Sequence, residues 1–297
     1  MQKKIPIIFF VHRRPNHTLK VLKVINRYKF KKLYIISDGY NSSLEKNLIL
    51  EVRDIIKKYQ KNKINIRLKM FKKNLGIRKV FKLGLNWVLK KEDKFIVLED
   101  DTLPNKSFFK FCEQMLIKYK NNKKISMISG SNLNDDLTKN IKDSFFFSKY
   151  SGIWGWASWK DRWLLYDDKL SNLKKFSFDK NFSNKSEIKF WKKNFKLLHR
   201  YLNKGAWDFQ LTFTNFYHNK LSIVPKLNLV TNIGYDDPSG INPNKNANLK
   251  SRYLKSPFSI PKKIENNKLY DDYCSRNIYS VPSLWYRIKF KIKKFLN

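Results

Sequence analysis

The feature that most constrains the fold is the repeated alternation, over the first hundred residues, of short apolar runs with stretches of helical periodicity. Runs of strand length are expected at residues 5–11, 32–37, 64–70 and 95–98, and helices at 16–28, 43–61 and 80–88. Strands joined by helices need crossover connections, which give parallel pairing. The pattern therefore predicts an α/β fold with a doubly wound, mostly parallel sheet flanked by helices.

The second half of the chain is less regular. Helices are expected at residues 105–120, 187–202 and 205–218, strands at 125–129 and 221–230, and a loop at 232–248. A segment crowded with tryptophans, Trp154 to Trp163, is expected to open a further helix. No internal repeat is present.

The formal net charge is +39, from 63 basic and 24 acidic residues. Such a charge attracts polyanions: nucleic acid, an anionic membrane or phosphate-bearing substrates. A solvated surface in a composition rich in Lys, Asn, Ile, Phe and Tyr is the alternative. Lys far outnumbers Arg, whereas proteins that recognise nucleic-acid sequence usually rely on Arg for bidentate contacts with bases. The sequence also contains no nucleic-acid-binding motif. We therefore expect no specific nucleic-acid partner.

The two cysteines, Cys112 and Cys274, provide neither a disulfide framework nor zinc-ligand spacing, which favours a reducing compartment. The apolar run near the N-terminus is too short for a signal peptide or a membrane span. The last residues, 283–297, alternate basic with large apolar side chains. Such a segment can lie on an anionic bilayer, or it can be a solvated terminal helix or frayed tail. We expect a cytoplasmic protein, peripheral on the inner membrane face.

Polar residues follow three of the expected strands, where α/β sheets bind their ligands. His12-Arg13 follows the first strand, Asp38-Gly39 the second, and Glu99-Asp100-Asp101 the fourth. Three adjacent acids next to a buried strand repel one another and need a counter-charge. Mg²⁺ or Mn²⁺ suits carboxylate oxygens and could bridge a diphosphate, although an exposed acidic turn is the alternative. Strand alternation would place Glu99 and Asp101 on one side and Asp100 on the other.

The order of these motifs resembles that of the GT-A-fold glycosyltransferases. More narrowly, the chain resembles the branching N-acetylglucosaminyltransferase of N-glycan synthesis and bacterial haemolytic-protein-like nucleotide-diphospho-sugar transferases. The matching segments are residues 9–15, 36–38, 97–101, 127–132, 152–159, 206–208 and 228–235. The resemblance implies one domain over 1–255, with a nucleotide-binding half (1–103) and an acceptor half (104–255), followed by a basic tail (256–297).

The resemblance also implies roles for individual residues. It places the nucleotide near His12, Arg13, Asp38, Asn74, Arg78, Glu99 and Asp100. Asp38 would accept a hydrogen bond from uracil, and Asp101 would bind the metal as the last acid of a DXD-type motif. Asp208 would be the base of an inverting transfer, which needs a carboxylate opposite the leaving group. Trp154, Gly155 and Trp156 would floor the acceptor or sugar pocket.

Each of these roles has a simpler alternative. Asp208 could be a helix N-terminal acid, Asp38 a turn residue, and His12 a satisfied histidine at a strand end. The tryptophans could be ordinary core packing. Relatives often carry a metal-binding His after the Asn-Ile-Gly motif. Here Asn232-Ile233-Gly234 continues without one, so Asp236, Asp237 or water would substitute.

The sequence therefore predicts a bacterial, metal-dependent glycosyltransferase of polysaccharide biosynthesis, hexosyl- or N-acetylhexosaminyl-transferring. The donor would be a nucleotide-diphosphate sugar, such as a UDP-sugar, and the acceptor a glycan or a lipid-linked molecule. A sugar nucleotidyltransferase is an alternative, but it would carry a Gly-rich loop where His12 to Pro15 stand. A non-enzymatic polyanion-binding protein is the other, and it would have no use for the acidic triplet.

Overall fold

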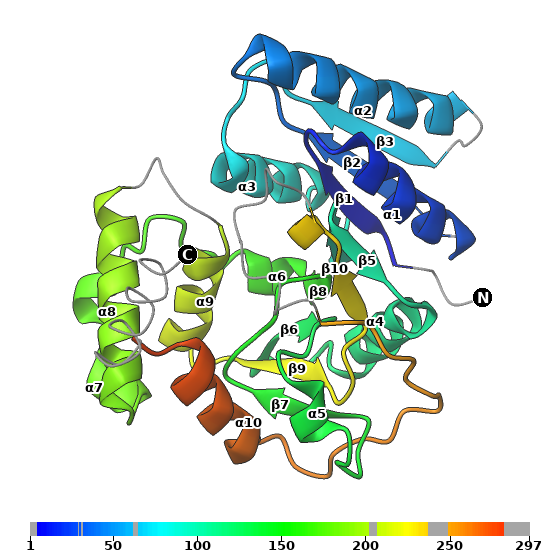
Figure 1. The fold of residues 1–297 in the computed structure, drawn as a ribbon. Helices are drawn as coiled ribbons and strands as arrows, with labels where there is room; N and C mark the ends of the chain where they lie inside the picture. Colours follow the sequence, from blue (N-terminus) through cyan, green and yellow to red (C-terminus); the bar gives the residue numbers. More distant parts are fainter. Residues whose placement is uncertain are drawn as a thin grey trace, which may run out of the picture.

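One eight-stranded sheet organises the chain, in the order β3-β2-β1-β4-β8-β6-β9-β7 (Figure 1). The computed structural model describes residues 5–28, 30, 32–61, 65–201, 207–236 and 249–281. Its strands are β1 (Ile7–Val11), β2 (Leu33–Ser37), β3 (Ile66–Met70), β4 (Lys94–Glu99), β5 (Thr102–Pro104), β6 (Ile125–Ser129), β7 (Phe145–Ser148), β8 (Trp156–Trp159), β9 (Leu221–Pro225) and β10 (Val230–Asn232). β5 and β10 form a separate antiparallel pair.

Helices connect and cover these strands. They are α1 (Pro15–Arg27), α2 (Ser43–Lys61), α3 (Ile77–Val88), α4 (Lys106–Lys118), α5 (Asp135–Thr138), α6 (Lys160–Trp163), α7 (Phe178–Asn181), α8 (Lys185–Arg200), α9 (Asp208–Tyr217) and α10 (Lys268–Tyr273). Short turns of other helix types are η1 (Leu173–Lys175), η2 (Gly234–Asp236) and η4 (Cys274–Ile278). Among the described residues, no helix combines the length and apolar character needed to cross a bilayer.

The pairing confirms the predicted α/β class. β1 pairs in parallel with β2 and β4, β2 with β3, and β6 with β9. β8 runs antiparallel between β4 and β6, and β7 runs antiparallel on β9. The sheet is therefore parallel across its first four strands and mixed beyond them.

Both faces of the sheet are covered, as the apolar strands require. Along β1, Ile7, Phe9 and Val11 pack into the core beneath α1, α2 and α4. Ile8 and Phe10 face the other way and pack on the α3 side. Figure 1 shows α1 and α2 together on one side of the first strands, with α3 on the other. The sheet is thus doubly wound, and it presents the ends of its parallel strands at one edge.

A third cluster of aromatic residues lies beyond the sheet, where α7, α8 and α9 meet α10. Trp191 and Phe216 are at its centre, with ring centroids 5.2 Å apart. Part of the sequence expected to form a basic tail belongs to the cores: Phe258 packs under α4, and Tyr270 and Cys274 join the aromatic cluster. Residues 282–297, which carry the expected membrane-binding segment, lie outside the described residues.

Two predictions about the second half were wrong in part. The tryptophan-rich segment does not open directly as a helix: its central residues form β8, and α6 begins only at Lys160. This segment forms a strand rather than a helix because its successive residues face opposite sides of the sheet: Trp156 packs in one core, and Ala157 and Trp159 pack in the other. The expected strand over 221–230 divides into β9 and β10, because the chain leaves the sheet after Pro225 and Val230 pairs with Pro104.

Candidate functional site

A cavity of about 370 Å³ opens at the carboxyl ends of β1, β2 and β4. It brings together most residues that the sequence placed around a nucleotide and a metal: His12, Arg13, Asp38, Asn74, Glu99, Asp100 and Asp101. Trp154, expected in the acceptor or sugar pocket, lines the same cavity. The topology explains this convergence, because β1 lies between β2 and β4 and all three strands point the same way. The expectation that ligand-binding residues follow these strands agrees with this arrangement.

Arg14, which the sequence analysis did not assign to the site, joins the two aspartates. Its Nη1 lies 2.7 Å from Asp101 Oδ2 and 3.2 Å from Asp100 Oδ1. The backbone N–H of His12 also donates to Asp100 Oδ2, at 3.1 Å. β4 ends at Glu99, so strand alternation does not extend to the next two residues. Both aspartates therefore face one guanidinium, which corrects the expectation that Asp100 points away from Asp101.

The surroundings of Glu99 and Asp100 raise the pKa of both carboxyl groups. Burial, with the charges of Asp101 and Asp100, raises the pKa of Glu99 well above its usual range. Burial and the Asp101 charge raise the pKa of Asp100 to about 6, despite the opposing effect of Arg14. Carboxylates at such sites favour an additional cation. The described residues nevertheless hold no preformed group of three or more His, Cys, Asp or Glu ligands.

Asp38 ties the end of β2 to the loop before α3. Its Oδ1 accepts the N–H groups of Gly39 (2.8 Å) and Leu75 (2.9 Å), and its Oδ2 accepts that of Gly76 (3.1 Å). The contact is close, because a Cβ at Gly39 would lie 2.3 Å from the backbone carbon of Lys73. Asp38 thus acts as a turn residue here, while still lining the cavity.

The wall facing Arg14 comes from the residues after β10. Ile233 donates its N–H to the Asp101 carbonyl at 2.8 Å, and a Cβ at Gly234 would lie 2.6 Å from Asp101 Oδ2. Tyr235 packs edge-on against Trp154, with ring centroids 5.8 Å apart. Tyr235 was not singled out from the sequence, although it ends a segment that carried the family resemblance. Asp237 and the side chain of Asp236 lie outside the described residues, so their proposed metal role is not addressed.

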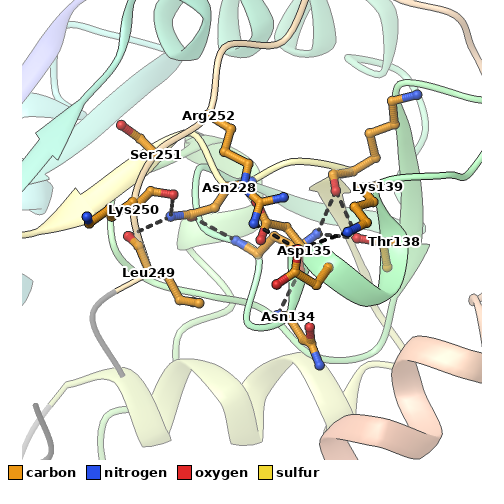
Figure 2. A network of polar contacts seen from close by, with 12 residues as sticks. Asn134, Asp135, Thr138, Lys139, Asn228, Leu249, Lys250, Ser251 and Arg252 are labelled. Carbon is orange, nitrogen blue, oxygen red and sulfur yellow. Dashed lines mark hydrogen bonds and ion pairs between the residues drawn. The ribbon is translucent and has the colours of Figure 1, made fainter. Parts of the chain in front are cut away.

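A buried polar network holds this wall in place (Figure 2). The Asn228 amide donates to the carbonyls of Val230 (2.8 Å) and Leu249 (2.9 Å), and its backbone N–H donates to Asp135 Oδ2 (3.0 Å). Asp135 in turn pairs with Arg252 at 3.3 Å. Residues 228–230 and 249–252 are thereby fixed to each other and to α5.

Asp208 is the first residue of α9 and is not among the residues that line the cavity. Its Oδ1 is buried and has no hydrogen-bond partner, and burial raises its pKa. Asp208 is close enough to Glu99 for its charge to contribute to the raised pKa of Glu99. It stands at a helix N-terminus, as the simpler alternative supposed, and beside the acidic triplet, as a catalytic base would. Ala206, which precedes it in the matching motif, lies outside the described residues.

Three predicted site residues are directed elsewhere. Arg78 donates to the carbonyl of Asp168 at 3.4 Å. Gly155 has φ +65° and its carbonyl accepts the Gly130 N–H at 2.7 Å, so this glycine serves a tight backbone approach. Trp156 is buried in the core among other rings, with Trp207 stacked at 5.6 Å, so it cannot stack on a sugar in this structure. Core packing, the alternative left open by the sequence, describes Trp156.

Comparison with known proteins gives distant likenesses only. No family model and no curated protein matches the chain. A mannosyltransferase from Pyrobaculum calidifontis, solved with GDP-Man and Mn²⁺, aligns over 53% of this chain and 45% of its own, with 9% identity and a TM-score of 0.38. S. aureus TarS, residues 1–349, aligns over 75% of this chain and 58% of its own, with 14% identity and a TM-score of 0.44. The match covers less than two thirds of either structure, and similarity at this level establishes no activity for this chain.

Proposed function

We propose that the protein is a metal-dependent glycosyltransferase that uses a nucleotide-diphosphate sugar, with its donor site in the cavity at the ends of β1, β2 and β4. The observation that carries the proposal is the convergence of Glu99, Asp100 and Asp101 in that cavity, where the two aspartates pair with Arg14. In a chain of charge +39, such a cluster of largely buried carboxylates favours binding of a metal ion. The motif order, which resembles that of the GT-A family, supports a nucleotide-diphosphate sugar as the ligand of that metal.

The donor's diphosphate would lie between the acids and the arginines of the first strand end. The donor set is hard oxygen, which suits Mn²⁺ or Mg²⁺, and Asp101 would be the main protein ligand. Such a cation would neutralise charge on the leaving diphosphate. The described residues supply no complete ligand shell, so phosphate and water would provide the remaining oxygens. Arg13 and Arg14 would bind the phosphates. The loop before α3, which Asp38 holds in place, would contact the base, which we propose to be uracil.

Asp208 would deprotonate the acceptor hydroxyl. Its buried, unpartnered Oδ1 and raised pKa make it a stronger base than an exposed aspartate. Its position on a different segment from Asp101 suits an inverting transfer, in which base and leaving group lie on opposite faces of the sugar. The transferred group would be a hexosyl or N-acetylhexosaminyl unit, and the acceptor a glycan or a lipid-linked molecule. A peripheral position on the inner membrane face rests on the sequence of residues 283–297 alone.

Calorimetric titration of UDP, with GDP and CDP as controls, tests the donor site with and without Mn²⁺. Wild type should bind UDP only weakly without Mn²⁺, and Asp101→Ala should abolish the gain that Mn²⁺ brings. Asp272→Ala, at an exposed position on α10, removes the same charge away from the cavity and should bind as wild type does. Absence of binding to every nucleotide, with metal present, would overturn the proposal and leave the polyanion-binding alternative.

A further inference from the structure

A second cavity, of about 340 Å³, lies at the opposite end of the sheet from the candidate active site. β8 is antiparallel to both β4 and β6, so β6 runs in the direction of β4 and begins at the far edge. β9 begins at the same edge, because it is parallel to β6. The lining joins the turns before these two strands to the end of β7 and to α7.

Four lysines from four separate segments meet in this cavity: Lys124, Lys149, Lys180 and Lys220. Backbone carbonyls hold three of the ammonium groups: Lys124 donates to Ile264 (3.3 Å), Lys149 to Asn181 (3.4 Å) and Lys220 to Lys123 (2.7 Å). A carbonyl positions an ammonium group without neutralising it, so the charges stay available.

The charges of this cluster are only partly compensated, because Asp271 acts on Lys149 and Asp161 on Lys220 from outside the cavity lining. Elsewhere lysines pair with acids, as Lys82 does with Asp168 at 2.8 Å, but within the described part of the chain none of the four cavity lysines does so. One acid, the exposed Glu265, lines the cavity. Burial and the positive charges of Arg162 and Lys123 lower the pKa of Lys220 despite the opposing charge of Asp161.

Asn215 adds an independent observation that points to a ligand. This asparagine lines the cavity and is only 4% exposed. The one described partner of its side chain is the sulfur of Met127, 3.8 Å from Nδ2, which is a weak acceptor. A buried amide normally has full hydrogen-bond partners. Asn215 therefore has hydrogen-bonding capacity to spare at the wall of a cationic cavity.

We infer that this cavity binds a small anion carrying two or more phosphate groups, at a site separate from the proposed donor site. Lysines act as point charges that suit phosphate oxygens. Four of them exceed what one phosphate needs, and the cavity has the size of a small-molecule site. The amide of Asn215 gives the site an orienting contact in addition to charge. The inference stands whether or not the protein is a glycosyltransferase.

Titration with inorganic tripolyphosphate at physiological salt tests the site by calorimetry. The triple variant Lys124→Gln, Lys149→Gln and Lys220→Gln should bind about tenfold or more weakly than wild type. Its matched control carries Lys58→Gln, Lys61→Gln and Lys90→Gln, which lowers the net charge equally at exposed positions, and should change affinity by less than about twofold. Equal losses in the two variants would overturn the inference, because binding would then follow net charge alone.

Two further variants separate this site from the donor site and from misfolding. Asn215→Leu leaves every charge in place and should still weaken tripolyphosphate binding, whereas Arg13→Gln with Arg14→Gln should leave binding at the lysine cavity intact. Loss of all binding in the double arginine variant would assign the anion to the other end of the sheet and overturn the inference. Thermal melts monitored by circular dichroism confirm that each variant is folded.

Discussion

The two ends of the central sheet carry opposite kinds of charged site. At the carboxyl ends of β1 and β4, Asp100 and Asp101 pair with Arg14 in a cavity that Glu99 also lines. At the start of β6 and β9, four lysines meet with a single exposed acid among them. In a chain with 63 basic residues, the cationic end could be a consequence of composition, whereas the acidic end runs against it.

The comparison teaches that the two sites are built differently. The acids are consecutive in the sequence and follow one strand, and His12 and Arg14 at the end of the neighbouring strand β1 hold two of them in place. The lysines come from residues 124, 149, 180 and 220, and only the packing of α7, α9 and β7 on the sheet brings them together. The acidic site therefore depends on one short segment and the residues that contact it, whereas the lysine site depends on how several distant segments pack.

The largest effect is expected from Asp208→Asn, which tests whether Asp208 deprotonates the acceptor hydroxyl. The rate of sugar transfer should fall by about 10²–10⁴-fold, because the amide cannot take the acceptor proton. Metal-dependent nucleotide binding should be unchanged, since Asp208 does not line the cavity. Kinetic assays beside calorimetry measure both, with Asp272→Asn as the charge-matched control. A parallel loss of nucleotide binding would make Asp208 a structural residue.

The pH dependence of the same step has a defined sign. Burial raises the pKa of Asp208, so the base is lost by protonation at a higher pH than for an exposed aspartate. The acidic limb of kcat/KM should therefore lie above the ordinary aspartate range. A pH–rate profile measures this, and a limb at the ordinary position would argue against Asp208 as the base.

Arg14→Gln removes the guanidinium that pairs with Asp100 and Asp101. It should destabilise the metal-free protein by about 3 kcal/mol, because two largely buried carboxylates then lack a positive partner. Mn²⁺ should restore part of this stability, because it supplies the missing positive charge at the same oxygens. Denaturant unfolding with and without Mn²⁺ measures both effects. A Mn²⁺ response no larger than that of wild type would mean that the cation binds elsewhere.

The first half of the fold could be predicted closely from the sequence. Every expected strand and helix before residue 104 is present, with ends within three residues of the predicted positions. The reason is physical: strands buried on both faces are uniformly apolar, and helices packed on them show one apolar stripe. The ends of such strands also predict that His12, Asp38 and the acidic triplet lie together, and all of them line one cavity.

The rest could not be predicted, because its determinants are not local. The sequence allowed Trp156 to be either a surface for sugar stacking or a core residue. It is buried because β8 lies between β4 and β6, and this strand order is not visible in the local sequence. Arg14 stood beside residues that were singled out, but its pairing with Asp100 and Asp101 spans more than eighty residues. The lysine cavity has no motif at all, since its members share no spacing.

Asn228→Ala is expected to weaken the fold by about 1–3 kcal/mol, because it leaves buried N–H and carbonyl groups unpaired. The network in Figure 2 anchors the segment that forms one wall of the acidic cavity, and it touches none of the cavity lysines. The variant should therefore impair nucleotide binding more than tripolyphosphate binding. Chemical denaturation and the two titrations measure these quantities, and equal impairment of both ligands would indicate a global effect.

Two glycines separate stability from binding at the acidic end. Gly39→Ala should cost about 1–3 kcal/mol of stability, because its Cβ would meet the rigid backbone of Lys73. Gly234→Ala would meet the side chain of Asp101 rather than backbone, so it should cost less stability than Gly39→Ala and weaken Mn²⁺-dependent nucleotide binding by about tenfold. Thermal melts and calorimetry on both variants measure the contrast. Unaltered binding by Gly234→Ala would mean that Asp101 does not hold the metal in this conformation.

The smallest effect is expected at the lysine end, in the titration of a single side chain. Burial, Arg162 and Lys123 lower the pKa of Lys220 in the free protein. A bound phosphate oxygen favours the charged ammonium, so tripolyphosphate should raise that pKa, reversing the direction of the shift. Lysine NMR with isotope-labelled side chains resolves the change, and Lys58, exposed on α2, provides the internal reference. Equal displacement of both lysines would show only the general field of a bound polyanion. A selective rise at Lys220 would show that the anion sits against the side chain that the fold has already crowded with positive charge.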